Sequence, residues 1–154
     1  MAIVHEPALP AQVSVRGEPQ PGFPVEPNRV AEIAGRFVLW LGPDEWLVVG
    51  AAEADYPDAA AAVDVSANRV AFELSGDSAE DVIAQGCSLD LHPSVFPPGR
   101  CAQTLLAAVP VILLHVDAAM WLILVRPSYA NYVRAWLADA IEGITSLRSN
   151  RFRH

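Results

Sequence analysis

The chain has 154 residues, of which 53% are hydrophobic and 18% charged, and its formal net charge at pH 7 is −8. This length predicts one domain with a hydrophobic core, and the composition is that of a globular protein. The acidic balance argues against binding to nucleic acid or to an anionic membrane surface, which both attract basic surfaces. All ten basic residues are arginines, which excludes mechanisms that use a catalytic lysine.

The cysteines and the apolar segments bear on the cellular location. Cys87 and Cys101 are too few for a disulfide framework, and the first residues lack the basic and apolar regions of a secretory signal. The most apolar segment, residues 109–125, is interrupted by a proline, a histidine and an aspartate, whereas a membrane-spanning helix needs about 20 apolar residues. We therefore expect a cytoplasmic protein with reduced thiols and no membrane span.

Residues 1–35 form a proline-rich arm. Within it, Val13 and Val15 alternate with polar residues, which predicts a short strand over 12–16. An arm with so little core of its own either lies on another surface or is a loose terminus, and both interpretations stay open.

Residues 37–41 and 46–49 read as two apolar strands around a Gly-Pro-Asp-Glu turn, which predicts a hairpin. Both strands are apolar on both faces, so the hairpin is either covered within the domain or meets a partner. Burial in the core is the favoured role for its tryptophans. Because tryptophan is also enriched at interface hot spots, we name Phe37, Trp40 and Trp46 as candidate partner contacts.

The middle of the chain predicts a short helix in the alanine-rich segment 51–63, after its proline, and then a strand over 69–74. A second helix follows, with Asp77 as its N-cap and Glu80 completing a capping box. Gly86 is expected to end this helix in the left-handed conformation.

The second half of the chain begins with a loop over residues 88–99, whose three prolines cannot continue a helix. Residues 101–106, 109–116 and 120–125 then read as strands. The last two are nearly continuous apolar runs, which is typical of strands in the centre of a sheet.

The strongest helix of the sequence begins at the cap residue Ser128 and is expected to end at Gly143. One of its faces is apolar and must pack on the sheet. The domain therefore spans 36–143, and 144–154 is expected to be a basic tail, either solvated or docking on an acidic partner. The element order predicts an α+β fold, a mostly antiparallel sheet with helices on one face.

A search for catalytic patterns finds none. The sequence has no phosphate-binding loop, no dinucleotide fingerprint and no nucleophile elbow. His92 lies between the two cysteines, but the spacing matches no zinc pattern and a fourth ligand is missing. His115, in an apolar strand, is expected to be a core histidine, while Asp64 and Asp90 precede turns and are expected to bond nearby amides. We therefore assign no catalytic, cofactor-binding or metal-binding residue.

Several motifs carry a resemblance to a known family. Asp64-Val-Ser, Leu74-Ser-Gly-Asp-Ser-Ala and Gly99-Arg-Cys-Ala-Gln-Thr resemble the folate-binding aminomethyltransferase-like superfamily, which includes the glycine-cleavage T-protein. A further set is similar to the gamma subunits of heterotetrameric sarcosine oxidase: Leu41-Gly-Pro-Asp-Glu-Trp-Leu47, Gly86-Cys-Ser-Leu-Asp-Leu-His-Pro93, Phe96-Pro-Pro-Gly99 and Cys101-Ala-Gln-Thr104. The likeness covers most of the chain from Phe37 onward.

The resemblance implies a fold that is a fragment of the aminomethyltransferase fold, without the second half that closes a folate cavity. It implies a non-catalytic accessory subunit that binds an alpha subunit, in a heterotetramer with beta and delta. Flavins, NAD and tetrahydrofolate are then expected in the partner subunits. Such a complex oxidatively demethylates sarcosine to glycine, passing the one-carbon unit to tetrahydrofolate and electrons to oxygen.

Three alternatives stay open at this point. The chain could act alone as a small folate-binding or aminomethyltransferase-like protein. It could be a gamma-like chain that self-associates into a homo-oligomer. It could also serve a related oxidase or dehydrogenase for another N-methyl amino acid, since the sequence does not fix the substrate.

Overall fold

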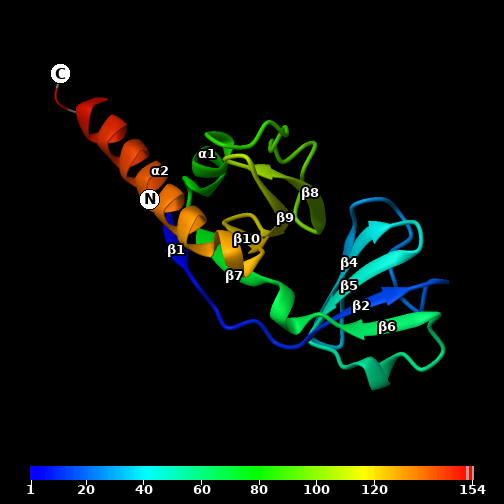
Figure 1. The fold of residues 1–154 in the computed structure, drawn as a ribbon. Coiled ribbons are helices and arrows are strands. Elements are labelled where there is room, and N and C mark those ends of the chain that lie inside the picture. Colours follow the sequence, from blue (N-terminus) through cyan, green and yellow to red (C-terminus); the bar gives the residue numbers. More distant parts are fainter. Residues whose placement is uncertain (152, 154) are drawn as a thin grey trace.

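Two five-stranded sheets form the framework of the computed structural model, which describes residues 1–151 and 153 (Figure 1). Sheet A has the strand order β1-β7-β10-β9-β8 and sheet B the order β3-β4-β5-β2-β6. Neighbouring strands run antiparallel in both sheets. The strands of sheet A are β1 (Ile3–His5), β7 (Val70–Ser75), β8 (Arg100–Leu106), β9 (Val109–Asp117) and β10 (Met120–Val125). Those of sheet B are β2 (Gln12–Arg16), β3 (Val30–Ile33), β4 (Arg36–Gly42), β5 (Glu45–Val49) and β6 (Ala61–Asp64).

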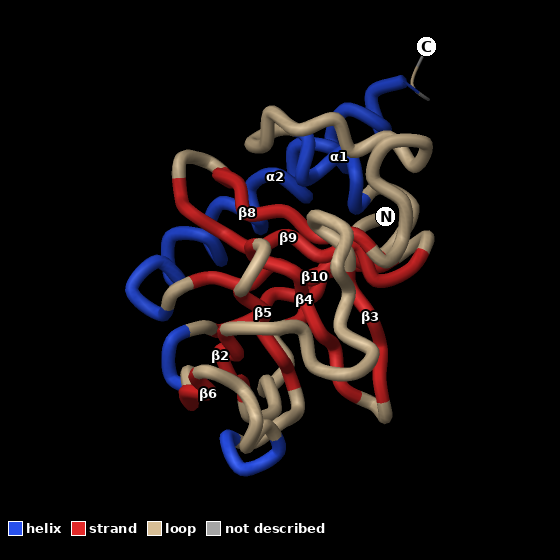
Figure 2. The backbone as a smooth tube through the Cα atoms, turned by 90° about the vertical axis from the view of Figure 1, so that its right-hand side faces the viewer, coloured by secondary structure: helices blue, strands red, loops and turns tan. Residues whose placement is uncertain are grey.

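Helices α1 (Ala79–Ala84) and α2 (Ala130–Arg151) lie on the face of sheet A that points away from sheet B (Figures 1 and 2). Phe72 and Trp121 of the sheet pack there with Ile83 of α1 and with Val133 and Leu137 of α2. The expected α+β fold with helices on one face of an antiparallel sheet is confirmed. The structure has two sheets, where the sequence pattern suggested one.

The second face of sheet A packs against sheet B. Leu39 and Leu47 of the hairpin β4–β5 meet Ile112, Leu114 and Leu124 in this layer. The outer face of the hairpin is covered as well, by Phe23 and Tyr56, whose rings lie 5.5 Å apart. The hairpin is therefore covered on both sides by its own chain, which explains why both of its faces are apolar.

The N-terminal arm lies on its own chain and contributes to both sheets. The strand predicted over 12–16 is confirmed as β2, between β5 and β6, while β1 pairs with β7. Near β3 the two sheets are joined, because Val30 N–H donates to the carbonyl of Gly99 at 2.9 Å and Cys101 N–H donates to that of Asn28 at 2.8 Å.

Residues 61–64 form strand β6, so the helix expected in the alanine-rich segment is wrong. Val15 lies opposite Ala62 in the ladder that β6 makes with β2. Local alanine content favours a helix by only a few tenths of a kcal/mol per residue. The hydrogen bonds between β6 and β2 at the edge of sheet B outweigh this preference. Within the described residues, the 3₁₀ helices are η1 (Glu53–Asp55), η2 (Ser66–Asn68) and η3 (Pro127–Tyr129).

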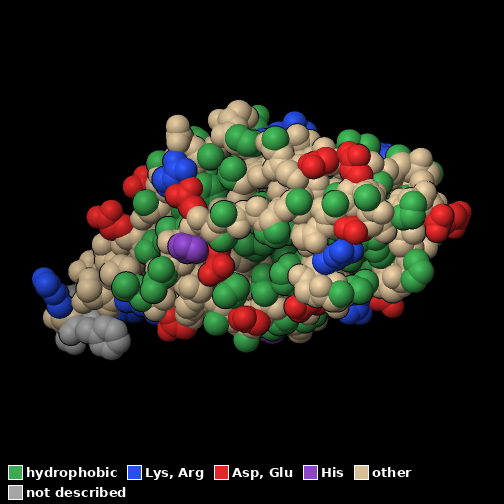
Figure 3. Space-filling view, turned by 90° about the horizontal axis from the view of Figure 1, so that it is seen from below, with side chains coloured by type: hydrophobic (Ala, Val, Ile, Leu, Met, Phe, Trp, Pro, Cys, Tyr) green, Lys and Arg blue, Asp and Glu red, His purple; other side chains and the backbone are tan. Residues whose placement is uncertain are grey.

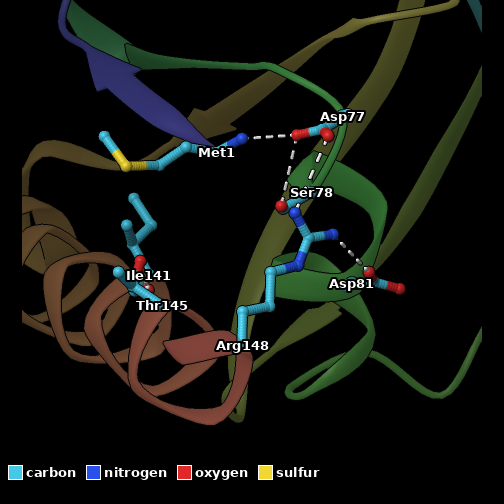
Figure 4. A network of polar contacts seen from close by, with 7 residues as sticks. All are labelled: Met1, Asp77, Ser78, Asp81, Ile141, Thr145 and Arg148. Atoms are coloured by element: carbon cyan, nitrogen blue, oxygen red, sulfur yellow. Dashed lines mark hydrogen bonds and ion pairs between the residues drawn. The ribbon is translucent and has the colours of Figure 1, made fainter. Parts of the chain in front are cut away.

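Helix α2 continues past Gly143 to Arg151, so the expected end at that glycine is wrong. A glycine inside a helix costs about 1 kcal/mol relative to alanine, and the packing of Ile144 against the core of sheet A offsets this cost. Arg148 in the extension forms ion pairs with Asp77 and Asp81 (Figure 4). The part of the expected tail up to residue 151 is thus helical, and residues 152 and 154 lie outside the described part.

Helix α1 departs from the expected caps. Its N-cap residue is Ser78 rather than Asp77. The carboxylate of Asp77 instead accepts a hydrogen bond from the Met1 ammonium group and pairs with Arg148 (Figure 4). Gly86 does not have the expected positive φ, and its role is a close approach between elements, because a Cβ there would lie 2.5 Å from the Cζ2 atom of Trp136.

Candidate subunit interface

The loop between α1 and β8 contains two of the motifs, Gly86–Pro93 and Phe96–Gly99, and is held in place by hydrogen bonds. His115 Nδ1 lies 2.7 Å from the carbonyl oxygen of Phe96, and Gly99 N–H donates to the carbonyl of His115 at 2.9 Å. The same Gly99 accepts the hydrogen bond from Val30. The loop is therefore fixed to β9 and to the start of β3.

Polar side chains within the loop stabilise its turns. His92 N–H donates to Asp90 Oδ1 at 3.0 Å, and Ser94 N–H donates to His92 Nδ1 at 3.1 Å. Elsewhere, Ser66 N–H donates to Asp64 Oδ1 at 2.8 Å, and hydrogen bonds from Ser66 lower the pKa of Asp64. The bonds to nearby amides expected for Asp90 and Asp64 are confirmed, and His92 stabilises the turns of the loop.

Two apolar side chains of this rigid loop point into solvent. Leu89 is 37% exposed and Val95 58% exposed. They line a hollow of about 210 Å³ together with Phe96, Arg100 and Ala102. An exposed apolar surface on a preorganised loop is typical of a protein–protein contact. We call this loop surface, with Leu89 and Val95 at its centre, the candidate subunit interface.

His115 is a buried core histidine, as the sequence predicted, and 3% of it is exposed. Its ring stacks on Trp121 with centroids 3.9 Å apart and planes 3° apart. Because the partner of Nδ1 is a carbonyl oxygen, Nδ1 carries the proton and donates. Its function in the structure is to hold the proline loop on the sheet.

The two cysteines are free thiols and both are buried. Burial raises the pKa of Cys101 to about 12, and its Sγ donates to the carbonyl of Trp40 at 3.6 Å. Cys87 lies 3.9 Å from the Thr104 hydroxyl. Among the described residues, no group of three or more His, Cys, Asp or Glu side chains is arranged to bind a metal ion.

The predicted contact residues of the hairpin occupy different positions. Trp46 has no exposed surface, and its Nε1–H donates to the carbonyl of Pro24 at 2.8 Å. The core role favoured for it is confirmed, and in this conformation it is out of a partner's reach. Phe37 and Trp40 are half-buried on opposite faces of β4, and their role as partner contacts stays a prediction.

Sequence reasoning missed Leu89 and Val95. The available signal was two apolar residues in a proline-rich loop, where neither strand nor helix periodicity can bury them. On the face shown in Figure 3, apolar side chains spread across the molecule and charges of both signs lie among them, without a large area of one sign. Among the described helices, none is long and apolar enough to cross a membrane.

The comparisons with known proteins agree with one another. Residues 21–142 match the family "Sarcosine oxidase, gamma subunit family". The chain is 35% identical to the sarcosine oxidase subunit gamma of Corynebacterium sp. (strain P-1), with 93% of this chain and 81% of that protein covered. It is also 35% identical to the subunit gamma of an Arthrobacter species, with 94% and 82% covered.

A solved structure is similar over nearly the whole fold. It is a chain of the heterotetrameric sarcosine oxidase from Corynebacterium sp. U-96, in complex with pyrrole 2-carboxylate. The two chains are 30% identical with a TM-score of 0.82, and the match covers 92% of this chain and 84% of that one. The chain therefore belongs to the sarcosine oxidase gamma subunit family.

Proposed function

We propose that this chain is the accessory gamma subunit of a heterotetrameric sarcosine oxidase, which oxidatively demethylates sarcosine to glycine. The observation that carries the proposal is the match of one continuous fold, over 92% of the chain, to a chain of such a heterotetramer. The chain contributes no catalytic residue of its own. Its polar loop residues are engaged in holding turns, as the bonds of His92 and Asp90 illustrate.

The cofactors of the reaction are proposed to lie in the partner subunits. Many flavin and NAD sites use a phosphate-binding loop at a helix N-terminus, and the sequence has no such fingerprint. Tetrahydrofolate, the proposed one-carbon acceptor, is likewise assigned to the larger subunits. The compartment proposed for the complex is the cytoplasm.

The partner proposed for the candidate subunit interface is the alpha subunit. Leu89 and Val95 are exposed in the free chain, on a loop that hydrogen bonds hold to β9 and to the start of β3. A preorganised contact of this kind loses little conformational entropy on association. The gamma subunit would thus stabilise alpha by covering apolar surface on it.

Co-expression tests the proposal. The chain, with an affinity tag, is produced together with the alpha, beta and delta subunits of its host, and the purified material is analysed by light scattering and visible absorbance. We expect one heterotetramer with flavin colour and with sarcosine oxidase activity. A colourless chain that elutes alone or as a homo-oligomer overturns the proposal.

The loop surface is tested within the same system. The double variant Leu89→Asp, Val95→Asp should fold but lose its place in the complex. Val63→Asp is a matched control, because Val63 is 53% exposed but lies on β6 at the edge of sheet B. Equal retention of both variants in the complex would remove the loop from the interface without affecting the assignment of the subunit.

A further inference from the structure

An open groove crosses the inter-sheet face of sheet A where sheet B no longer covers it. The side-chain amide of Gln103 donates to the carbonyl of Leu41 at 2.9 Å and links this edge of the groove to the hairpin of sheet B. Beyond it, Leu105 is 54% exposed. The groove has a volume of about 370 Å³, with an apolar floor that includes Pro110, Ile112 and Leu124.

Two arginines form one wall of this groove, Arg69 before β7 and Arg126 after β10. Val70 lies opposite Val125 in the ladder between these strands, and the next pair in the same register is Arg69 and Arg126. Like charges directly opposite one another on neighbouring strands destabilise a sheet. Burial first, and then the charge of Arg126, lower the pKa of Arg69.

Neither guanidinium has a counter-ion within the described part of the chain. No carboxylate of a described residue lies within 4.0 Å of either one, and neither side chain donates a hydrogen bond there. Glu45 acts on Arg69 from a distance, but it is already paired with Arg16 at 3.3 Å. Arg69 is half-buried and Arg126 is exposed, so the desolvation cost falls on Arg69, and no anion among the described residues compensates it.

The contrast with other arginines indicates that this arrangement serves a purpose. The chain has 18 acidic residues against ten basic ones. Five arginines elsewhere have acidic partners, while Arg100 donates to the carbonyl of Pro27. The paired arginines are Arg16, Arg29, Arg36, Arg134 and Arg148. The missing negative charge at Arg69 and Arg126 is therefore expected to come from another molecule.

The edge of strand β8 borders the groove and favours an extended ligand. Cys101 N–H points away from β9, since it donates to Asn28. By the alternation of an antiparallel strand, the main chain of Gln103 and Leu105 also points to this edge. Such an edge can accept an added strand, with main-chain hydrogen bonds giving affinity and side-chain pockets giving specificity.

We propose that this groove binds an extended acidic segment of a partner subunit, with one Asp or Glu carboxylate between Arg69 and Arg126. Apolar side chains of the same segment would lie on Leu105, Pro110 and Ile112. The volume of the groove favours a peptide over a free inorganic ion, because it has room for roughly ten water molecules. A small anion would also leave the apolar floor exposed to water. The inference rests on the proposed function, which supplies the partner subunit.

Charge-neutralising variants test the arginine pair. The affinity of Arg69→Gln, Arg126→Gln and the double variant for the preassembled alpha, beta and delta subunits is measured by calorimetry in low and in high salt. We expect each single variant to weaken binding about tenfold or more, with a smaller salt dependence than the native chain. Arg151→Gln is the control, because it removes the same charge from an exposed site on the last turn of α2.

Cross-linking identifies the occupant. A photoreactive phenylalanine analogue replaces Leu105, and the cross-linked peptide is identified by mass spectrometry. A peptide of a partner subunit with an acidic residue beside apolar ones supports the proposal. A cross-link to a second copy of this chain, or to a basic peptide, overturns it.

The outcomes separate the inference from the proposed function. If the native chain does not join the complex, the proposed function fails, and the inference fails with it. If the double variant folds and joins with native affinity, only the inference fails. The groove is a free-anion site, and the proposal is overturned, if phosphate stabilises the native chain but not the double variant while both bind the partners equally. Because Arg126 is exposed, the single variant Arg126→Gln keeps the test valid even if changes at Arg69 impair folding.

Discussion

Gly86 and Trp136 are in such close contact that a Cβ on the glycine would lie 2.5 Å from Cζ2 and 2.9 Å from Cη2 of the indole. Gly86 follows helix α1, and Trp136 lies on helix α2. The carbonyl of Gly86 also accepts a hydrogen bond from Ala107 N–H at 2.9 Å. This contact sets how closely the end of α1 approaches α2, and with it the start of the loop that carries the candidate subunit interface.

Replacing Gly86 with alanine is expected to destabilise the fold by about 1–3 kcal/mol, the usual cost of overpacking a rigid contact. Denaturant titration of the native chain and of the variant gives this difference in the free energy of unfolding. The matched control is Gly143→Ala, where a Cβ meets nothing within 4 Å. In the interior of α2 this control should stabilise the chain by about 0.5–1 kcal/mol. Equal effects of the two substitutions would contradict the packing explanation.

The thiol of Cys101 is expected to be almost inert in the native chain. Since its pKa is about 12, only about one molecule in ten thousand carries the reactive thiolate at pH 8. In a Cys87→Ser background, a thiol reagent should modify Cys101 slowly in the native state and rapidly in denaturant. Labelling at the same rate in both states would show that the site is open to solvent.

The two tryptophans of the hairpin should respond differently to truncation. Trp46→Ala removes a fully buried ring and its hydrogen bond to Pro24, so we expect a loss of about 3–5 kcal/mol in the free energy of unfolding. Trp40→Ala should cost less, because that ring is only half-buried. If Trp40 also contacts a partner, its variant will bind the other subunits more weakly at nearly native stability. If Trp40→Ala binds the other subunits with native affinity, Trp40 is not a partner contact.

An ion pair between the arm and α2 predicts a pH dependence. Arg134 donates to both carboxylate oxygens of Glu6, at 2.7 and 2.6 Å, and the hydrogen bond from Arg134 lowers the pKa of Glu6 below its usual 4.5. A lowered folded-state pKa means that the contribution to stability is present above pH 4.5 and is lost as the pH falls through the folded value.

The variant Glu6→Gln should therefore melt slightly below the native chain at pH 7, and the difference should narrow below about pH 4.5. The effect is small because both side chains are about half exposed and water screens the pair. Added salt at pH 7 should narrow the difference as well. A difference in melting temperature that is constant across pH and salt would mean that Glu6→Gln acts through lost packing and not through lost charge.

The sequence predicted the elements whose apolar pattern is strong and local. Strands β9 and β10 are nearly continuous apolar runs and are confirmed in the centre of sheet A. The hairpin β4–β5 was predicted for the same reason, but its two apolar faces could not show that one of them packs on another sheet of the same chain. The strand nature of Ala61–Asp64 depends on β2, far away in the sequence, so no local pattern contains it.

The surface features were harder to predict because they depend on register and loop geometry. Arg69 and Arg126 meet only through the pairing of β7 with β10, and neither has a local signal. The cap expected at Asp77 was wrong because its carboxylate forms ion pairs with Met1 and Arg148 instead. Both partners are distant in the sequence and come close only in the folded chain. The motifs around the proline loop, by contrast, identified the family directly.

The strand pairings of the N-terminal arm fix the order in which this subunit can be completed. Strand β1 can pair only after β7 has been synthesised, because Ile3 lies opposite Ser75 in the ladder. The inner face of the hairpin can be buried only later, after Ile112 and Leu124 have been synthesised. Such long-range contacts make folding slow relative to chains of local contacts. Until β10 has been synthesised, Leu39 and Leu47 of the hairpin lack Leu124 as a packing partner, so the layer between the sheets is completed only late in synthesis.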